Sequence, residues 1–120
     1  NRNLRKPFLR YSELGSYEII FPFAKSREMQ AFKKKILEPI NEHDAENNSN
    51  LLETLTQYVL SGCSMRVTAK TISQHENTVR YRLEKIALLT GLDFKYPAQL
   101  EELALAIKID ICSGLLGDRA

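Results

Sequence analysis

Residues 67–86 read V-T-A-K-T-I-S-Q-H-E-N-T-V-R-Y-R-L-E-K-I. Apolar residues recur at helical spacing on both sides of a polar stretch, which predicts two helices, at about residues 65–73 and 76–90, joined by a turn. Ala69 supplies the small side chain that two helices need where they cross at a steep angle. The predicted core shared by the two helices consists of Val67, Ala69, Ile72, Val79, Leu83 and Ile86.

Two short helices with a shared apolar face and a polar turn are typical of a helix-turn-helix. In that motif the first helix braces the second, and the second places its N-terminal residues in the major groove of DNA. The second helix carries hydrogen-bonding and cationic side chains on the arc away from its apolar face. The candidate DNA-contacting residues are Thr68, Lys70, His75, Asn77, Thr78, Arg80, Tyr81, Arg82 and Lys85.

These candidates divide into two roles. Phosphate contacts are predicted for His75, Arg80, Arg82 and Lys85. Base-edge contacts are predicted for Asn77, Thr78 and Tyr81. Each role has a plainer alternative: the cations form a solvated helix face, Tyr81 packs with its hydroxyl in water, or Asn77 or Thr78 caps the helix.

The distribution of charge supports the first reading of the cations. A formal net charge of +2 over 120 residues is too small to argue nucleic-acid binding by itself. However, residues 66–85 carry five Lys or Arg against two acids, whereas residues 38–53 carry five acids and no Lys or Arg. Positive charge is therefore concentrated on the predicted helix pair.

Several other classes of protein have no support in the sequence. Cys63 and Cys112 are far apart and have no metal-ligand spacing, so buried free thiols are expected and no metal or cofactor is predicted. The sequence contains neither a glycine-rich phosphate loop nor paired catalytic carboxylates, so it gives no indication of an enzyme. No apolar run is long enough to span a bilayer, so we expect a cytoplasmic protein without a membrane partner. Because the chain begins at Asn1, we expect a fragment or a processed product.

The first part of the chain predicts a short strand and a helix. The β-branched and aromatic run from Tyr17 to Phe23, with Pro22 inside it, predicts an edge strand. Ser26 is a plausible N-cap for a following helix, which Pro39 is expected to end or kink. The polar residues 42–50 predict a loop, which divides a tail of an upstream regulatory domain (1–47) from a helix-turn-helix domain (48–120).

Helices are also predicted on both sides of the motif. Asn50 and Glu53 resemble a capping box for a helix at about 50–61, and Ser64 and Gly91 are expected to begin and end the motif. Pro97 favours the first turn of an apolar helix at about 97–113, which should cover Leu88 and Leu89. The predicted fold is therefore all-α: a core of about four helices, preceded by one helix and one short strand.

The motifs L52-E-T-L-T-Q-Y58, T68-A-K, N77-T-V-R-Y-R-L-E-K-I86 and T90-G-L-D93, with a closing Leu/Ala-rich helix, resemble one family. This is the C-terminal helix-turn-helix domain of the PucR/CdaR bacterial transcriptional regulators, with a Fis-like motif. The likeness covers about residues 50–112. His75-Glu76 departs from the basic or small residue that many relatives have there, and a carboxylate at that point repels phosphate unless it accepts from a cytosine amino group.

The resemblance implies a sequence-specific DNA-binding regulator of a catabolic operon of the purine, allantoin or sugar-diacid type. It also implies that a small-molecule effector binds a missing N-terminal domain. Since one helix-turn-helix buries little surface on DNA, we expect a homodimer, paired through residues 17–23 or the closing helix. The alternative class is a helical interaction or dimerisation module whose basic helix meets an acidic partner.

Overall fold

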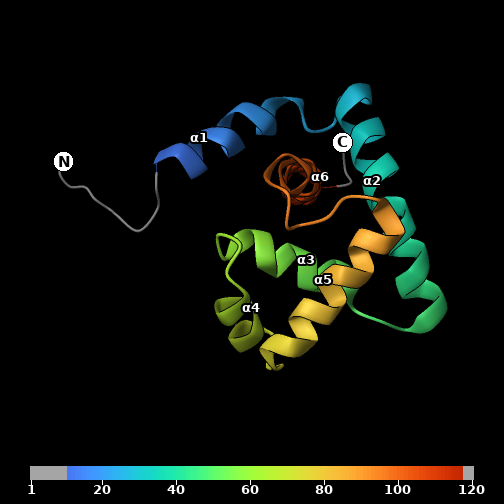
Figure 1. The fold of residues 1–120 in the computed structure, drawn as a ribbon. Coiled ribbons are helices and arrows are strands. Elements are labelled where there is room, and N and C mark those ends of the chain that lie inside the picture. The colour runs from blue at the N-terminus through green and yellow to red at the C-terminus, as the bar shows by residue number, and fades with distance from the viewer. Residues whose placement is uncertain (1–10, 118–120) are drawn as a thin grey trace.

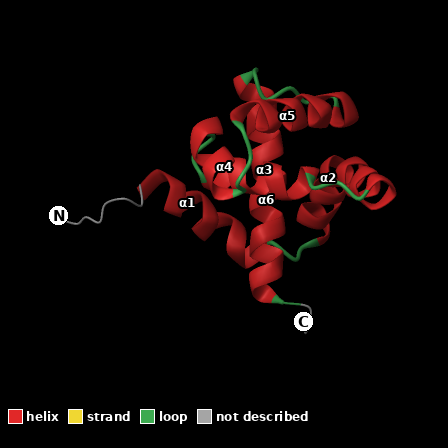
Figure 2. Cartoon of the chain, turned by 90° about the horizontal axis from the view of Figure 1, so that it is seen from below, coloured by secondary structure: helices red, strands yellow, loops and turns green. Residues whose placement is uncertain are grey.

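The computed structural model describes residues 11–117, and side chains from residue 15 onward. Its elements are the helices α1 (Tyr11–Ile20), α2 (Arg27–Asn47), α3 (Leu51–Leu60), α4 (Met65–Thr71), α5 (Glu76–Thr90) and α6 (Pro97–Leu116), with a short 3₁₀ helix η1 (Phe21–Phe23) after α1. Residues 11–117 contain no strand (Figure 2), and the predicted all-α class is confirmed.

Local signals account for the ends of several helices. The hydroxyl of Ser64 accepts from the backbone amide of Val67 at 3.1 Å, and the hydroxyl of Ser26 accepts from that of Met29 at 3.2 Å. Gly91 ends α5 with a φ of 77°, in the left-handed region that a residue without a Cβ enters at little cost. The span of α5 is the predicted one, and the other three core helices differ from their predicted spans by at most three residues at an end.

The predicted edge strand from Tyr17 to Phe23 is wrong, because these residues lie in α1 and η1. No partner strand exists in the described chain, whereas a helix can bury Ile20 and the following Ala24 against Ile109 and Cys112 of α6. Pro22 lies in the first turn of η1, where its missing amide hydrogen breaks no helical bond. Burial against α6 therefore overrides a local preference for extended structure.

Pro39 does not end the second helix, since α2 continues for 21 residues from Arg27 to Asn47. A proline inside a helix removes one hydrogen bond and costs about 3 kcal/mol. Ile36, Leu37 and Ile40, next to it in the helix, are all buried in the main core. Burial of three large apolar side chains offsets a cost of that size.

The predicted capping box at Asn50 is also absent, because the Asn50 side chain makes no capping hydrogen bond. The carboxylate of Asp44 takes its place: Oδ1 accepts from the amide of Leu51 and Oδ2 from the amide of Leu52, both at 2.9 Å. The hydroxyl of Ser49 also donates to Asp44 Oδ1, at 2.6 Å. An acid of α2 thus satisfies the N-terminus of α3, where a negative charge also interacts favourably with the helix dipole.

One core joins α2 to the predicted DNA-binding helices. Ile36, Leu37 and Ile40 of α2 pack in the same cluster as Leu55 of α3 and Leu83 of α5. The predicted loop at residues 42–50 is wrong for residues 42–47, which lie in α2, and the predicted boundary between residues 47 and 48 falls in the turn between α2 and α3. Because the three helices share this core, the elements on the two sides of the boundary pack as one folded body.

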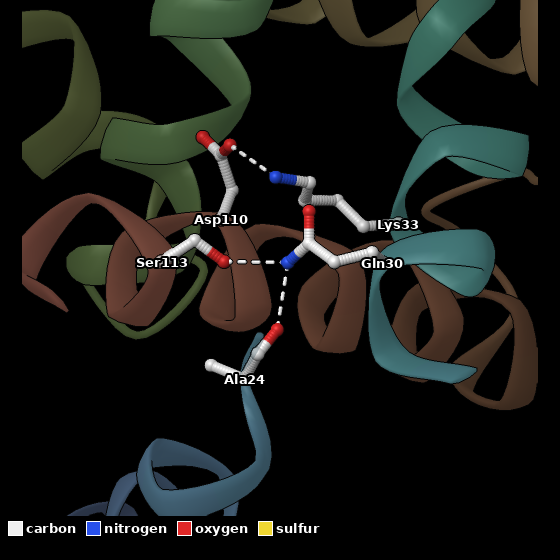
Figure 3. Close-up of polar contacts among 5 residues, drawn as sticks. All are labelled: Ala24, Gln30, Lys33, Asp110 and Ser113. Atoms are coloured by element: carbon white, nitrogen blue, oxygen red, sulfur yellow. Dashed lines mark hydrogen bonds and ion pairs between the residues drawn. The ribbon is translucent and has the colours of Figure 1, made fainter. Parts of the chain in front are cut away.

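Helix α6 lies in the middle of the molecule and is seen end-on in Figure 1, with α1 above it, α2 running down beside it, and α3, α4 and α5 below. Polar contacts fasten its C-terminal half to the start of α2 (Figure 3). The amide of Gln30 donates to the carbonyl of Ala24 at 2.6 Å and to the hydroxyl of Ser113 at 2.8 Å, and Lys33 lies 3.6 Å from Asp110. The second side of α6 is therefore partly covered by the chain itself.

Candidate nucleic-acid interface

Helices α4 and α5 form the predicted pair around a small buried contact. Ala69, Val79, Leu83 and Ile86 are buried, and Ile72 packs half-buried against the same cluster. Val67 is the exception: it was predicted in this core, but it is 38% exposed, because it lies on the face of α4 opposite the buried Thr68 and Ala69. The turn between the helices passes through Ser73 with a φ of 57°.

The start of α5 shows which residue caps this helix, for which the sequence left Asn77 and Thr78 as alternatives. His75 is the N-cap residue, and its carbonyl accepts from the amides of Thr78 and Val79 at 3.0 and 3.2 Å. Asn77 is the second residue inside the helix, so it is not the cap, and its side chain is exposed. Thr78, one residue further, is half-buried.

The outward arc of α5 faces away from Val79, Leu83 and Ile86. Asn77 and Tyr81 lie one turn apart on this arc, and Tyr81 is 64% exposed. The alternative in which the Tyr81 ring packs against other side chains of the described chain is therefore wrong. Lys85 follows at the edge of the arc, half-buried. Leu88, which was expected under the closing helix, is 83% exposed on the same arc, and only Leu89 packs on the core.

The two arginines on the flanks of α5 differ in their surroundings. Arg80 is exposed and makes no hydrogen bond or ion pair with its side chain in the described part of the chain. Arg82 is half-buried, and its guanidinium donates from Nη1 to Thr54 Oγ1 of α3 at 3.0 Å. Residue type and helical position made these two arginines equivalent in the sequence, but α3 contacts only one of the two flanks.

Helix α4 gives one candidate a structural role. Thr68 is fully buried; its hydroxyl donates to the carbonyl of Ser64 at 2.7 Å and lies 3.1 Å from the Ser61 hydroxyl. Because Thr68 has no exposed surface, it cannot contact DNA, and the prediction that it is a DNA-contacting residue is wrong. Lys70 is exposed, and Arg66 lies one turn earlier on the same exposed face. Arg66 was absent from the candidate set, although the same helical spacing from Lys70 could have found it.

No group of three or more metal-binding side chains occurs in the described residues. Cys112 is buried and Cys63 half-buried, both as free thiols, and burial raises the pKa of each. No helix in residues 11–117 is long and apolar enough to cross a bilayer.

The braced helix pair, with its polar and cationic outward face, defines a helix-turn-helix DNA-binding domain. Residues 51–109 match the family model of the PucR C-terminal helix-turn-helix domain. The chain therefore carries a member of this domain family, which bears out the resemblance seen in its motifs. The match spans α3, α4, α5 and most of α6.

Three similar proteins from Bacillus subtilis (strain 168) have names that describe activation or regulation. The DNA-binding transcriptional activator AdeR is 27% identical over 104 residues, which is 87% of this chain and 25% of that protein. The proline-responsive transcriptional activator PutR is 30% identical over 83 residues, covering 69% of this chain and 20% of PutR. The purine catabolism regulatory protein is 37% identical over 82 residues, covering 68% and 15%. No solved structure gives a significant match.

Proposed function

We propose that this chain binds a specific duplex DNA site by placing α5 in the major groove, as part of a regulator of transcription. The observation that carries the proposal is the outward arc of α5, on which Asn77 and Tyr81 are exposed at the N-terminal end of the helix. Residues at the start of a recognition helix reach deepest into the groove.

Within this proposal, Asn77, Thr78 and Tyr81 contact base edges. An Asn amide both donates and accepts hydrogen bonds and suits adenine, and the Tyr81 hydroxyl can donate or accept. Arg80 and Lys85 contact phosphates from the two edges of the helix. His75 and Lys70 contact phosphates beside its N-terminus, and Arg66 joins Lys70 on α4.

Glu76 is the first residue of α5 and is exposed. A carboxylate in a first helical turn interacts favourably with the helix dipole, but it repels nearby phosphate. We assign Glu76 to the groove rather than to the backbone, where it accepts from the amino group of a cytosine. Glu76→Gln then weakens preference at one base pair while raising affinity for DNA of random sequence.

The names of the relatives support a proposal for the wider role. Two of them are named for purine catabolism and for a response to proline, so we propose that the target is a catabolic operon and that the protein acts in the cytoplasm. The chain covers 25% or less of the three relatives named above. A small-molecule effector is proposed to bind a domain outside residues 1–120.

We also propose that the regulator binds two half-sites as a homodimer. Residues 17–23 cannot pair as a strand, but they contribute to an apolar face with the end of α6. A groove of about 500 Å³ between α1 and α6 is lined by residues that include Tyr17, Phe21, Pro22, Ile111 and Leu115, and Leu115 is 70% exposed. Because α1 lies on the far side of α6 from α5 (Figure 1), a second copy on this face leaves both recognition helices free.

The salt dependence of binding tests the proposed function. Fluorescence anisotropy with a duplex enriched from a random-sequence pool should give an affinity that falls steeply between about 50 and 200 mM salt, because each phosphate contact releases counterions. The four Lys and Arg side chains assigned to phosphate, Arg66, Lys70, Arg80 and Lys85, correspond to a slope of about −3.6 per chain in log affinity against log salt. A flat response, or no binding, refutes DNA binding and favours the alternative, a module that meets an acidic protein partner.

A further inference from the structure

One nitrogen of the Arg82 guanidinium is hydrogen-bonded to a buried side chain of α3, although Arg82 as a whole is half-buried. Its Nη1 donates to Thr54 Oγ1 at 3.0 Å, and the same hydroxyl donates to the carbonyl of Asn50 at 2.9 Å. A threonine hydroxyl has one hydrogen to donate, so the bond to Arg82 uses its acceptor side. Thr54 is fully buried, and Arg82 is the side chain that supplies its second partner.

This bond joins two helices that are fixed at other points as well. It links residues 28 apart in sequence, one in the first turn of α3 and one near the middle of α5. The first turn of α3 is held in turn by Asp44 of α2, through the amides of Leu51 and Leu52. Helix α5 is thereby tied through α3 to α2, by polar bonds whose geometry is directional, in addition to apolar contacts that permit small rotations.

The rotation of α5 about its axis decides which side chains face the groove. Asn77 and Tyr81 lie on the outward arc, and Arg82 lies on the flank toward α3. Loss of the Arg82 bond therefore releases the side-chain hydrogen bond that, among the described residues, joins α5 to α3. Base-edge contacts depend on that angle, whereas contacts by long flexible cations to phosphate tolerate a small change in it.

We infer that Arg82 is a positioning residue, which sets the angle of the recognition helix through Thr54 and makes no phosphate contact. This revises the role that the sequence predicted for Arg82, and it rests on the proposed function of α5. Arg80 is the contrasting case, since its exposed side chain makes no such bond in the described chain.

Thr54 offers a test that leaves every charge in place. Because Thr54 is fully buried, it cannot contact DNA itself, and Thr54→Val removes the acceptor while Arg82 stays intact. We expect Thr54→Val and Arg82→Ala each to weaken binding to the enriched duplex by about tenfold, and the double variant to be no weaker than either single variant. Thr54→Ser keeps the hydroxyl and should bind as the wild type does.

The salt slope separates positioning from phosphate contact. Arg82→Ala should keep the wild-type slope and the wild-type affinity for random-sequence duplex, whereas Lys85→Ala should lower the slope by about one unit. Lys35→Ala, which removes an exposed cation on α2, is the control for net charge. Circular dichroism at the assay temperature confirms that each variant is folded.

Three results overturn the inference alone, each in a wild type that binds with a steep slope. The first is an Arg82→Ala slope lower by about one unit. The second is a folded Thr54→Val that keeps full affinity for the enriched duplex, and the third is single losses that add in the double variant. A wild type with no salt-dependent binding to duplex DNA overturns the proposed function, and the inference with it.

Discussion

Asp44→Ala tests whether a side chain of α2 holds the first turn of α3. The carboxylate accepts from two backbone amides at 2.9 Å and from the Ser49 hydroxyl at 2.6 Å. Without it, the amides of Leu51 and Leu52 lose their acceptor, and Leu51 is a buried residue. The helix that carries Thr54 would then begin without a cap.

The expected cost follows from these contacts. Loss of an ordinary N-cap costs about 0.5–2 kcal/mol, and hydrogen bonds to a charged acceptor contribute about 1.5–3 kcal/mol. Because Asp44 is half-buried, solvent screens part of this gain, and we expect Asp44→Ala to lower the free energy of unfolding by about 2 kcal/mol. Asp44→Asn, whose neutral oxygen still accepts, should lose about half as much. For a chain of this length, about 2 kcal/mol lowers Tm by about 6–12 °C.

Urea denaturation followed by circular dichroism at 222 nm measures this difference. Glu46→Ala is the matched control, because Glu46 is an exposed acid in the same last turn of α2. Its effect should stay within about 0.5 kcal/mol. Equal stabilities for Asp44→Ala and Glu46→Ala would refute the capping role and leave the start of α3 without an explanation.

Three further predictions concern DNA, assembly and pH. Lys85→Ala should weaken binding to all duplexes alike, whereas Asn77→Ala should relax preference at one base pair by about 1–3 kcal/mol; competition binding with a panel of single-base variants checks both. Leu115→Lys, in the groove between α1 and α6, should shift the chain from dimer to monomer in sedimentation, and Leu60→Lys, at an exposed leucine of α3, should not. Burial raises the pKa of the Cys112 thiol, so the unfolded chain ionises first as the pH rises. The free energy of unfolding should then fall as the pH rises above the unfolded thiol value, less steeply in Cys112→Ala.

The helices were predictable where periodicity and capping agree in the sequence. The span of α5 matches because an apolar face, a polar turn before it and Gly91 after it all point to the same limits. Ser26 and Ser64 cap as predicted, since their hydroxyls reach amides only three residues away.

Errors in the fold arose where a distant element decides a local conformation. Residues 17–23 have a composition that favours a strand, yet they are helical because α6 offers them an apolar surface. Pro39 stays inside a helix because its neighbours are held in the core. Asp44 caps a helix that begins seven residues later, a distance that no local capping pattern covers. Each outcome depends on the assembled structure, which propensity does not contain.

The candidate site shows the same division at the level of single side chains. Helical spacing correctly separates the buried face of α5 from the arc that carries Asn77 and Tyr81, because both faces are properties of one helix. It cannot separate Arg80 from Arg82, since the partner that distinguishes them comes from α3, 28 residues away from Arg82. Thr68 has a hydroxyl of the kind that contacts DNA, but its position in α4 buries it in the core, and helical spacing alone did not reveal this. Helical spacing in the sequence therefore predicts which arc of α5 is exposed, whereas the contact with α3 decides that Arg82 is hydrogen-bonded and that Arg80, among the described residues, is not.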